Sequence, residues 1–83
     1  MEQNPKRQEQ ETPADGLERL RRVTRLAPHD PELRLMLARA LLGNSLPDEA
    51  IDELRSVIAM SPNHLEARKL LELASQRTLL RRS

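Results

Sequence analysis

The sequence contains no cysteine and no aromatic residue, and its 83 residues include only two glycines. Without cysteine, neither a disulfide nor a cysteine-ligated metal ion can stabilise the fold. Without phenylalanine, tyrosine or tryptophan, the core must be built from aliphatic side chains, and no ring is available to stack on a nucleic-acid base. The two glycines, Gly16 and Gly43, lie too far apart to form a glycine-rich phosphate-binding loop.

Long apolar runs and an excess of one charge are also missing. No stretch approaches the roughly 20 apolar residues of a membrane-spanning helix, and the polar first dozen residues do not resemble a signal peptide. We therefore predict a cytoplasmic protein without a membrane partner. The net charge is only +1, so the chain lacks the positive field that attracts nucleic acids. We interpret the arginines within 19–25 and 77–82 as solvated helix residues rather than as a nucleic-acid site.

Patterns typical of catalysis are absent as well. His29 and His64 stand next to turn residues, and no histidine–carboxylate pair recurs at a metal-ligand spacing. The serines have no arrangement that suggests a nucleophile. We predict that the chain is not an enzyme, and that it holds no metal and no cofactor.

Helical signals dominate the remainder of the chain. The apolar spacing, together with prolines and capping residues, predicts helices over about 13–27, 31–42, 47–60 and 64–80. Thr12, Asp30 and Asn63 are the predicted N-caps. Gly43 and Asn44 suit a left-handed C-cap at the end of the second helix. Residues 1–12 have no apolar periodicity and are predicted to form a disordered tail, and 81–83 form a short basic end.

An internal repeat of 34 residues runs through the helices. Nine of the 28 residues from Pro13 to Ala40 are identical to the residue 34 positions later, whereas chance predicts about two or three. The matched residues are Pro13/Pro47, Leu20/Leu54, Arg21/Arg55, Val23/Val57, Pro28/Pro62, Glu32/Glu66, Arg34/Arg68, Leu37/Leu71 and Ala40/Ala74. The four predicted helices are therefore two copies of one two-helix pattern.

This pattern resembles the tetratricopeptide repeat, a helix–turn–helix unit of 34 residues. The residues that carry the resemblance are Leu37, Ala38, Leu41, Ala50, Leu54, Val57 and Pro62. Over residues 13–80 the resemblance implies an all-α fold, a four-helix fragment of a right-handed α-solenoid with one full repeat flanked by two half repeats. The usual aromatics of the family are missing, since Arg34 takes a place often held by tryptophan. Glu72 replaces the small residue matched by Ala38, which favours a last helix that faces solvent.

The resemblance also implies a function and a site. Family members present a concave groove, lined by the first helices of successive repeats, to a peptide or helix of a partner protein. The corresponding residues of this chain are Leu35, Arg39, Leu42, Lys69, Leu73 and Gln76. Such a mixed apolar and basic groove suits a partner segment with hydrophobic anchors and an acid or a C-terminal carboxylate. For Leu35 and Leu42, packing in the core is an equally good interpretation.

Self-assembly is the alternative function. Stacked repeats bury their faces on their neighbours, and about three repeats are usually needed for stability. The first half repeat of this chain lacks its partner helix, and the last helix ends in Leu79 and Leu80. A homo-oligomer formed through these incomplete terminal repeats is therefore the second prediction, beside an adaptor or scaffold that binds another protein.

Overall fold

The computed structural model describes residues 13–82, and this part of the chain contains four α-helices and no strand. The helices are α2 (Pro13–Leu26), α3 (Pro31–Gly43), α4 (Pro47–Met60) and α5 (Leu65–Arg82). Their bounds agree with the predicted bounds to within two residues. The predicted disordered tail and its Thr12 cap lie outside the described residues.

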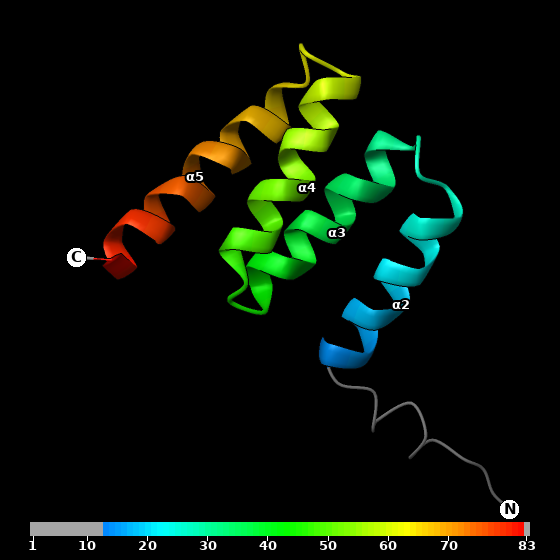
Figure 1. Ribbon diagram of the computed structural model, residues 1–83, viewed down its shortest axis with the longest axis horizontal. Helices are drawn as coiled ribbons and strands as arrows, with labels where there is room; N and C mark the ends of the chain where they lie inside the picture. Colours follow the sequence, from blue (N-terminus) through cyan, green and yellow to red (C-terminus); the bar gives the residue numbers. More distant parts are fainter. Residues whose placement is uncertain (1–12, 83) are drawn as a thin grey trace, which may run out of the picture.

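The four helices form a stack in chain order. Each helix packs against the next one, and successive helices run in opposite directions from α2 at one edge to α5 at the other (Figure 1). Short connections between the helices produce this antiparallel arrangement. The all-α fold predicted from the repeat is confirmed, with one full repeat, α3 and α4, between the half repeats α2 and α5.

The residues that cap the starts of α3 and α5 are 34 positions apart in the sequence. The Asp30 carboxylate accepts hydrogen bonds from the backbone N–H groups of Glu32, at 3.0 Å, and Leu33, at 3.2 Å, as predicted for an N-cap. At the start of α5 the predicted Asn63 cap is wrong. His64 stands 34 residues after Asp30, and its Nδ1 accepts the backbone N–H of Ala67 at 3.2 Å. A ring nitrogen with a free lone pair thus replaces the carboxylate oxygen as the cap.

The turn between α3 and α4 corrects a second prediction. Gly43 remains helical and Asn44 has φ −101°, whereas Ser45 has φ 61° and is the left-handed residue. The Ser45 N–H donates to the Leu42 carbonyl at 3.1 Å, and the Leu46 N–H donates to the Leu41 carbonyl at 2.9 Å. This pair of bonds is the Schellman motif, whose left-handed residue follows the C-cap. The left-handed position is therefore two residues later than Gly43.

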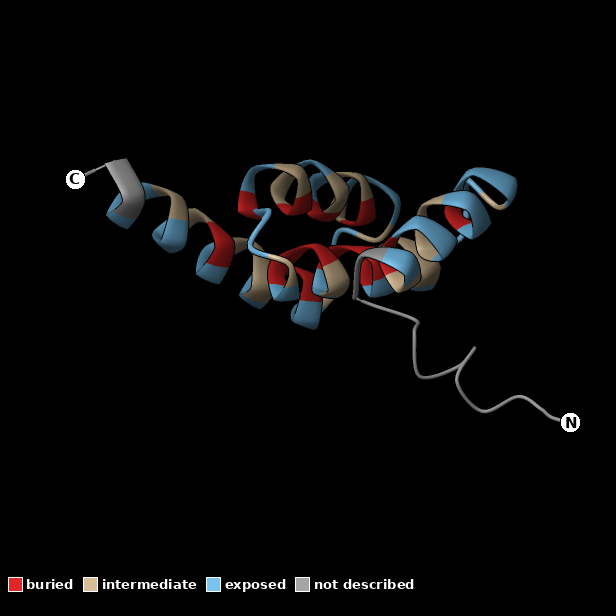
Figure 2. Ribbon diagram, turned by 90° about the horizontal axis from the view of Figure 1, so that it is seen from below, coloured by how far each residue is buried: buried red, intermediate tan, exposed pale blue. Residues whose placement is uncertain are grey.

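The core is aliphatic and lies mainly on the two central helices. Figure 2 shows buried residues concentrated in the middle of the stack, with mostly intermediate and exposed residues towards its two ends. Leu41 of α3 and Leu54 of α4 are both 0% exposed. The buried hydrophobic residues are Leu17, Leu35, Leu37, Ala38, Leu41, Leu42, Ala50, Leu54, Val57, Ala67 and Ala74.

The internal repeat is also visible in individual contacts. The Nε of Arg34 donates to the Pro28 carbonyl at 3.1 Å, and the Nε of Arg68 donates to the Pro62 carbonyl at 2.7 Å. The same contact therefore closes the turn before α3 and the turn before α5. Arg34 also pairs with Glu53 of α4, with 2.9 Å between Nη1 and Oε1, and so ties the two helices of the full repeat together.

Candidate interaction surface between α3 and α5

Polar contacts join α3 to the α5 segment, although the two helices are not consecutive in the chain. Arg39 of α3 forms an ion pair with Glu66 of α5, and both side chains are about half exposed. Glu32, in the first turn of α3, contacts the N-cap of α5, with 2.9 Å between its Oε2 and the Nε2 of His64. These contacts place the first helices of the two successive repeats beside one another and form a shared surface.

His64 has both of its ring nitrogens engaged at this surface. The backbone N–H of Ala67 can only donate, so Nδ1 of His64 is the acceptor in that bond. The ring proton then lies on Nε2, from which it donates to the Glu32 carboxylate. This histidine therefore has a structural role, capping α5 and linking it to α3.

The six predicted groove residues divide into two groups. Leu35 is 1% exposed and Leu42 is 8% exposed. Leu35 is therefore a core residue and cannot contact a partner in this structure, because its position on α3 points it into the stack. Leu42 contributes only an edge to the surface. The other four residues, Arg39, Lys69, Leu73 and Gln76, are exposed.

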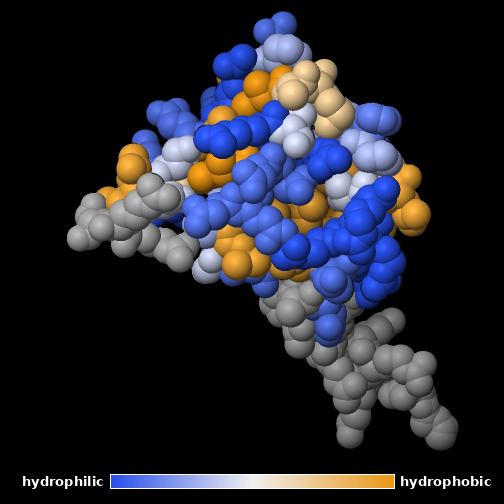
Figure 3. Space-filling model, viewed as in Figure 1, coloured by the Kyte–Doolittle hydropathy of each residue, from blue (hydrophilic) through white to orange (hydrophobic). Residues whose placement is uncertain are grey.

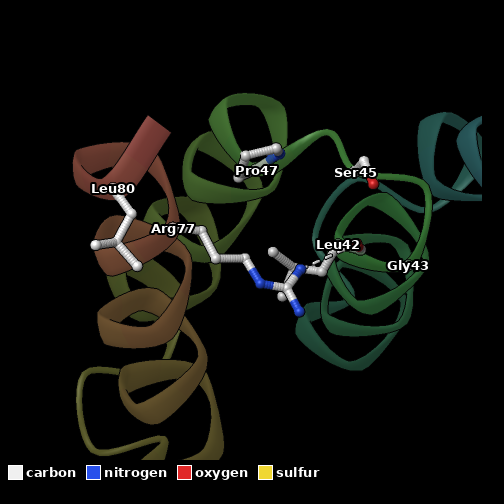
Figure 4. Close-up of a pocket in the computed structure, with 6 residues that line it drawn as sticks. All are labelled: Leu42, Gly43, Ser45, Pro47, Arg77 and Leu80. Atoms are coloured by element: carbon white, nitrogen blue, oxygen red, sulfur yellow. Dashed lines mark hydrogen bonds between the residues drawn. The ribbon is translucent and has the colours of Figure 1, made fainter. Parts of the chain in front are cut away.

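A hollow of about 510 Å³ lies at one end of this surface, where α3, the following turn and α4 meet the second half of α5. Its lining residues are Leu42, Gly43, Ser45, Pro47, Arg77 and Leu80. In Figure 4, the Arg77 side chain extends from α5 across the hollow towards the end of α3. Leu80, also on α5, is 75% exposed and forms an apolar edge.

Arg77 gives the hollow its positive charge. Its Nη1 donates to the Leu42 carbonyl at 3.2 Å, in the last turn of α3, where the helix dipole favours a cation. A guanidinium has five N–H donors, and this bond uses one of them. Among the described residues, no carboxylate forms an ion pair with Arg77. The hollow can therefore accept an anionic group from outside the chain, next to apolar walls.

The prediction from the sequence missed most of this hollow. The groove residues on α5 were predicted as the residues 34 positions after Leu35, Arg39 and Leu42 of α3. Arg77 lies 34 positions after Gly43, which has no side chain and was not among the residues compared. Arg77 follows the predicted Gln76 directly, so extending the comparison by one residue would have found it. Leu80 and Ser45 lie outside the matched pattern, and Pro47 is matched only to Pro13, so their place beside Arg77 required the structure.

Other kinds of site are not evident in the part of the chain described. Residues 13–82 contain no cluster of three or more potential metal ligands. None of the four described helices is long and apolar enough to cross a membrane. The face shown in Figure 3 is mostly hydrophilic, with small apolar patches between the charged residues.

Comparison with known families gives one match. A family model described as tetratricopeptide repeat matches residues 8–74, which is most of the chain. No curated protein and no solved structure matches it. The match spans most of the described fold, including all residues on which the resemblance was based.

Proposed function

Because the chain belongs to the tetratricopeptide repeat family, we propose that it is an adaptor that binds a segment of another protein on the surface between α3 and α5. Repeats of this family generally mediate protein–protein interaction and typically act as non-enzymatic scaffolds. The proposal assigns partner contacts to Arg39, Lys69, Leu73 and Gln76, with the edge of Leu42. The proposal also assigns the hollow beside Arg77 to the partner-binding surface.

The hollow is the observation that carries the proposal. It has apolar walls and contains Arg77, a cation that has no carboxylate partner among the described residues. Leu73 is 44% exposed and Leu80 is 75% exposed, so apolar area is available on the same helix as Arg77 and Lys69. A partner segment that inserts an apolar side chain and places an acid near Arg77 satisfies both features. Arg39 contributes less, because its charge is already paired with Glu66.

Selection from a random peptide library displayed on phage, with the full chain as bait, tests this proposal. We expect the selected peptides to share an apolar residue close to an Asp or a Glu. Arg77→Gln and Leu73→Ser should each weaken binding of a selected peptide by about tenfold, in line with the loss of a charged contact or an apolar anchor. Arg22→Gln, an exposed arginine on α2, is the matched control and should leave the affinity unchanged. Peptides without acids, or equal affinities for all variants, contradict the proposal.

Self-assembly is a second candidate function. It is supported by apolar residues at the first end of the stack, since Val23 is 38% exposed and Leu26 is 81% exposed. Light scattering with refractive-index detection, over a series of concentrations, measures the mass in solution without needing an aromatic chromophore. A dimer that persists on dilution supports this second function, and a monomer at high concentration rules it out.

A further inference from the structure

Three exposed residues of α5 stand four positions apart along one side of the helix. They are Lys69, Leu73 and Arg77, so an apolar side chain lies between two cations. Because an α-helix rises about 1.5 Å per residue, each step of four residues advances about 6 Å along α5. Residues four apart are also neighbours on the helix surface. We call these three residues the α5 row.

Both cations of the α5 row are available to a ligand. Within the described residues 13–82, neither Lys69 nor Arg77 forms an ion pair with a carboxylate. The Arg77 guanidinium uses one of its five donors on the Leu42 carbonyl and extends across the hollow (Figure 4). The row therefore offers two positive charges about 12 Å apart along the helix, with an apolar contact halfway between them.

An extended peptide has a matching period. Each of its residues advances about 3.3 Å, and every second side chain points to the same side, so side chains on that side recur about every 6.6 Å. This spacing differs by less than about 1 Å from the step of the α5 row, and the flexible stem of Lys69 can absorb the difference. We infer that the α5 row binds an extended segment of a partner protein with the pattern acid-x-apolar-x-acid. This inference rests on the proposed adaptor function and specifies the segment that the adaptor recognises.

Gln76 favours an extended segment over a helix at this row. It is exposed and lies three residues after Leu73, on the same side of α5. Its amide group carries both hydrogen-bond donors and an acceptor. The backbone N–H and C=O groups of an extended segment are not paired within the segment and can bond to this amide, whereas a helix pairs its own backbone groups. Gln76 therefore adds a contact that suits an extended ligand.

A folded second copy of this chain does not present the pattern in extended form. An acid-x-apolar-x-acid sequence with a large aliphatic centre occurs once in the chain, as Glu49, Ile51 and Glu53. These residues lie in α4, where Glu49 pairs with Arg21 and Glu53 pairs with Arg34. Conformation and charge therefore favour a segment of a different protein as the occupant.

Three synthetic peptides test the spacing directly. Each carries a fluorescent label and is blocked at both termini, so that two aspartates are its only charges. The first contains Asp-Ser-Leu-Ser-Asp, and the second contains Ser-Asp-Leu-Asp-Ser, which has the same composition but turns the acids away from the side of the leucine. The third is a stapled helix with its leucine four residues from each aspartate. By fluorescence anisotropy with the full chain, we expect the first peptide to bind at least about tenfold more tightly than the other two.

Variants of the row test the contacts themselves. Lys69→Gln should weaken the first peptide by about fivefold, the upper range for an exposed ion pair, and Arg77→Gln by about tenfold. Arg22→Gln removes the same charge from an exposed position on α2 and should have no effect, which controls for net charge. Of the two peptides in which lysine replaces one aspartate, one should bind Lys69→Glu more tightly than it binds the unchanged chain. Circular dichroism verifies that the variants fold.

Several results overturn the inference. Equal affinity of the first two peptides refutes the spacing, and tighter binding of the stapled helix refutes the extended conformation. Full affinity of the first peptide for Lys69→Gln, together with weak binding to Arg77→Gln, confines recognition to the hollow; the adaptor proposal then survives and this inference fails. Absence of binding by all three peptides has the same meaning if the phage selection still yields acidic and apolar peptides. A dimer in light scattering that Lys69→Glu converts to a monomer identifies a second copy as the occupant and also refutes the inference.

Discussion

Replacing Ser45 with glycine should stabilise the protein. Ser45 is left-handed, with φ 61°, and this conformation costs an L-residue roughly 1–2 kcal/mol relative to the right-handed region. Glycine avoids that cost but loses more conformational freedom on folding, by roughly 0.5–1 kcal/mol. The difference leaves a gain of about 0.5–1 kcal/mol for Ser45→Gly. In a domain of this size, such a gain raises Tm by roughly 2–8 °C.

The neighbouring glycine provides the matched test of the same reasoning. Gly43 lies in the last turn of α3 without a positive φ, and a Cβ added there meets no atom within 4 Å. Gly43→Ala should therefore also stabilise the protein, by about 0.5–1 kcal/mol, because alanine loses less freedom in a helix. Urea unfolding followed by circular dichroism at 222 nm measures both free energies without an aromatic probe.

Whether each substitution raises or lowers the free energy of unfolding shows which residue of the turn, Ser45 or Gly43, is left-handed. If Gly43 were the left-handed residue, as its sequence context suggests, Gly43→Ala would lower the free energy of unfolding by about 1 kcal/mol. Ser45→Gly would then bring no gain, because it would add flexibility to an ordinary turn residue. A destabilised Gly43→Ala variant would therefore refute the Schellman assignment. Ser45→Ala is the control, since alanine and serine are both disfavoured at a positive φ.

Three further changes test the core and the cap of α5. Thr24 is 4% exposed and its hydroxyl has no hydrogen-bond partner among the described residues, so Thr24→Val should raise the free energy of unfolding by about 1 kcal/mol in urea unfolding. His64→Ala removes the acceptor for the Ala67 N–H and should lower Tm, at a cost of about 0.5–2 kcal/mol, and His64→Asn should recover part of it because its amide oxygen can accept the same bond. Leu41→Glu, at a position that is 0% exposed, buries an unpaired carboxylate and should abolish the cooperative melt, whereas Leu73→Glu, at an exposed position, should leave it intact.

The sequence alone was sufficient to predict the helices and their order. Their apolar spacing and prolines are local signals, and the 34-residue repeat gives two independent copies of each signal. The two errors in the caps have a common physical cause. Several polar or flexible residues stand together at each turn, and local propensity does not decide which of them takes the special conformation. Ser45 is left-handed because of the hydrogen bonds of the whole turn, although Gly43 is the better residue for that role in isolation.

The candidate surface was less predictable than the fold. Leu35 and Leu42 were open to two interpretations because a repeat pattern specifies which helix face a residue occupies, but not how deeply the neighbouring helix covers it. Both are buried, since α3 lies between α2 and α4 and also borders α5. Arg77 was missed because its counterpart in the 34-residue period is Gly43, which has no side chain, and its bond to the Leu42 carbonyl is visible only in the structure.

The two ends of the stack differ in a way that bears on function. On α5, Glu72 and Ser75 stand where α3 has the buried Ala38 and Leu41, although Leu73 and Leu80 are exposed elsewhere on the same helix. On α2, the residues 34 positions before Ala50, Leu54 and Val57 of α4 are Gly16, Leu20 and Val23, so this face of the helix has remained apolar. Complete burial of a leucine or valine contributes about 1.5–3 kcal/mol, and part of that gain remains unused on α2. Val23 of α2 is accordingly 38% exposed, whereas its counterpart Val57 of α4 is fully buried.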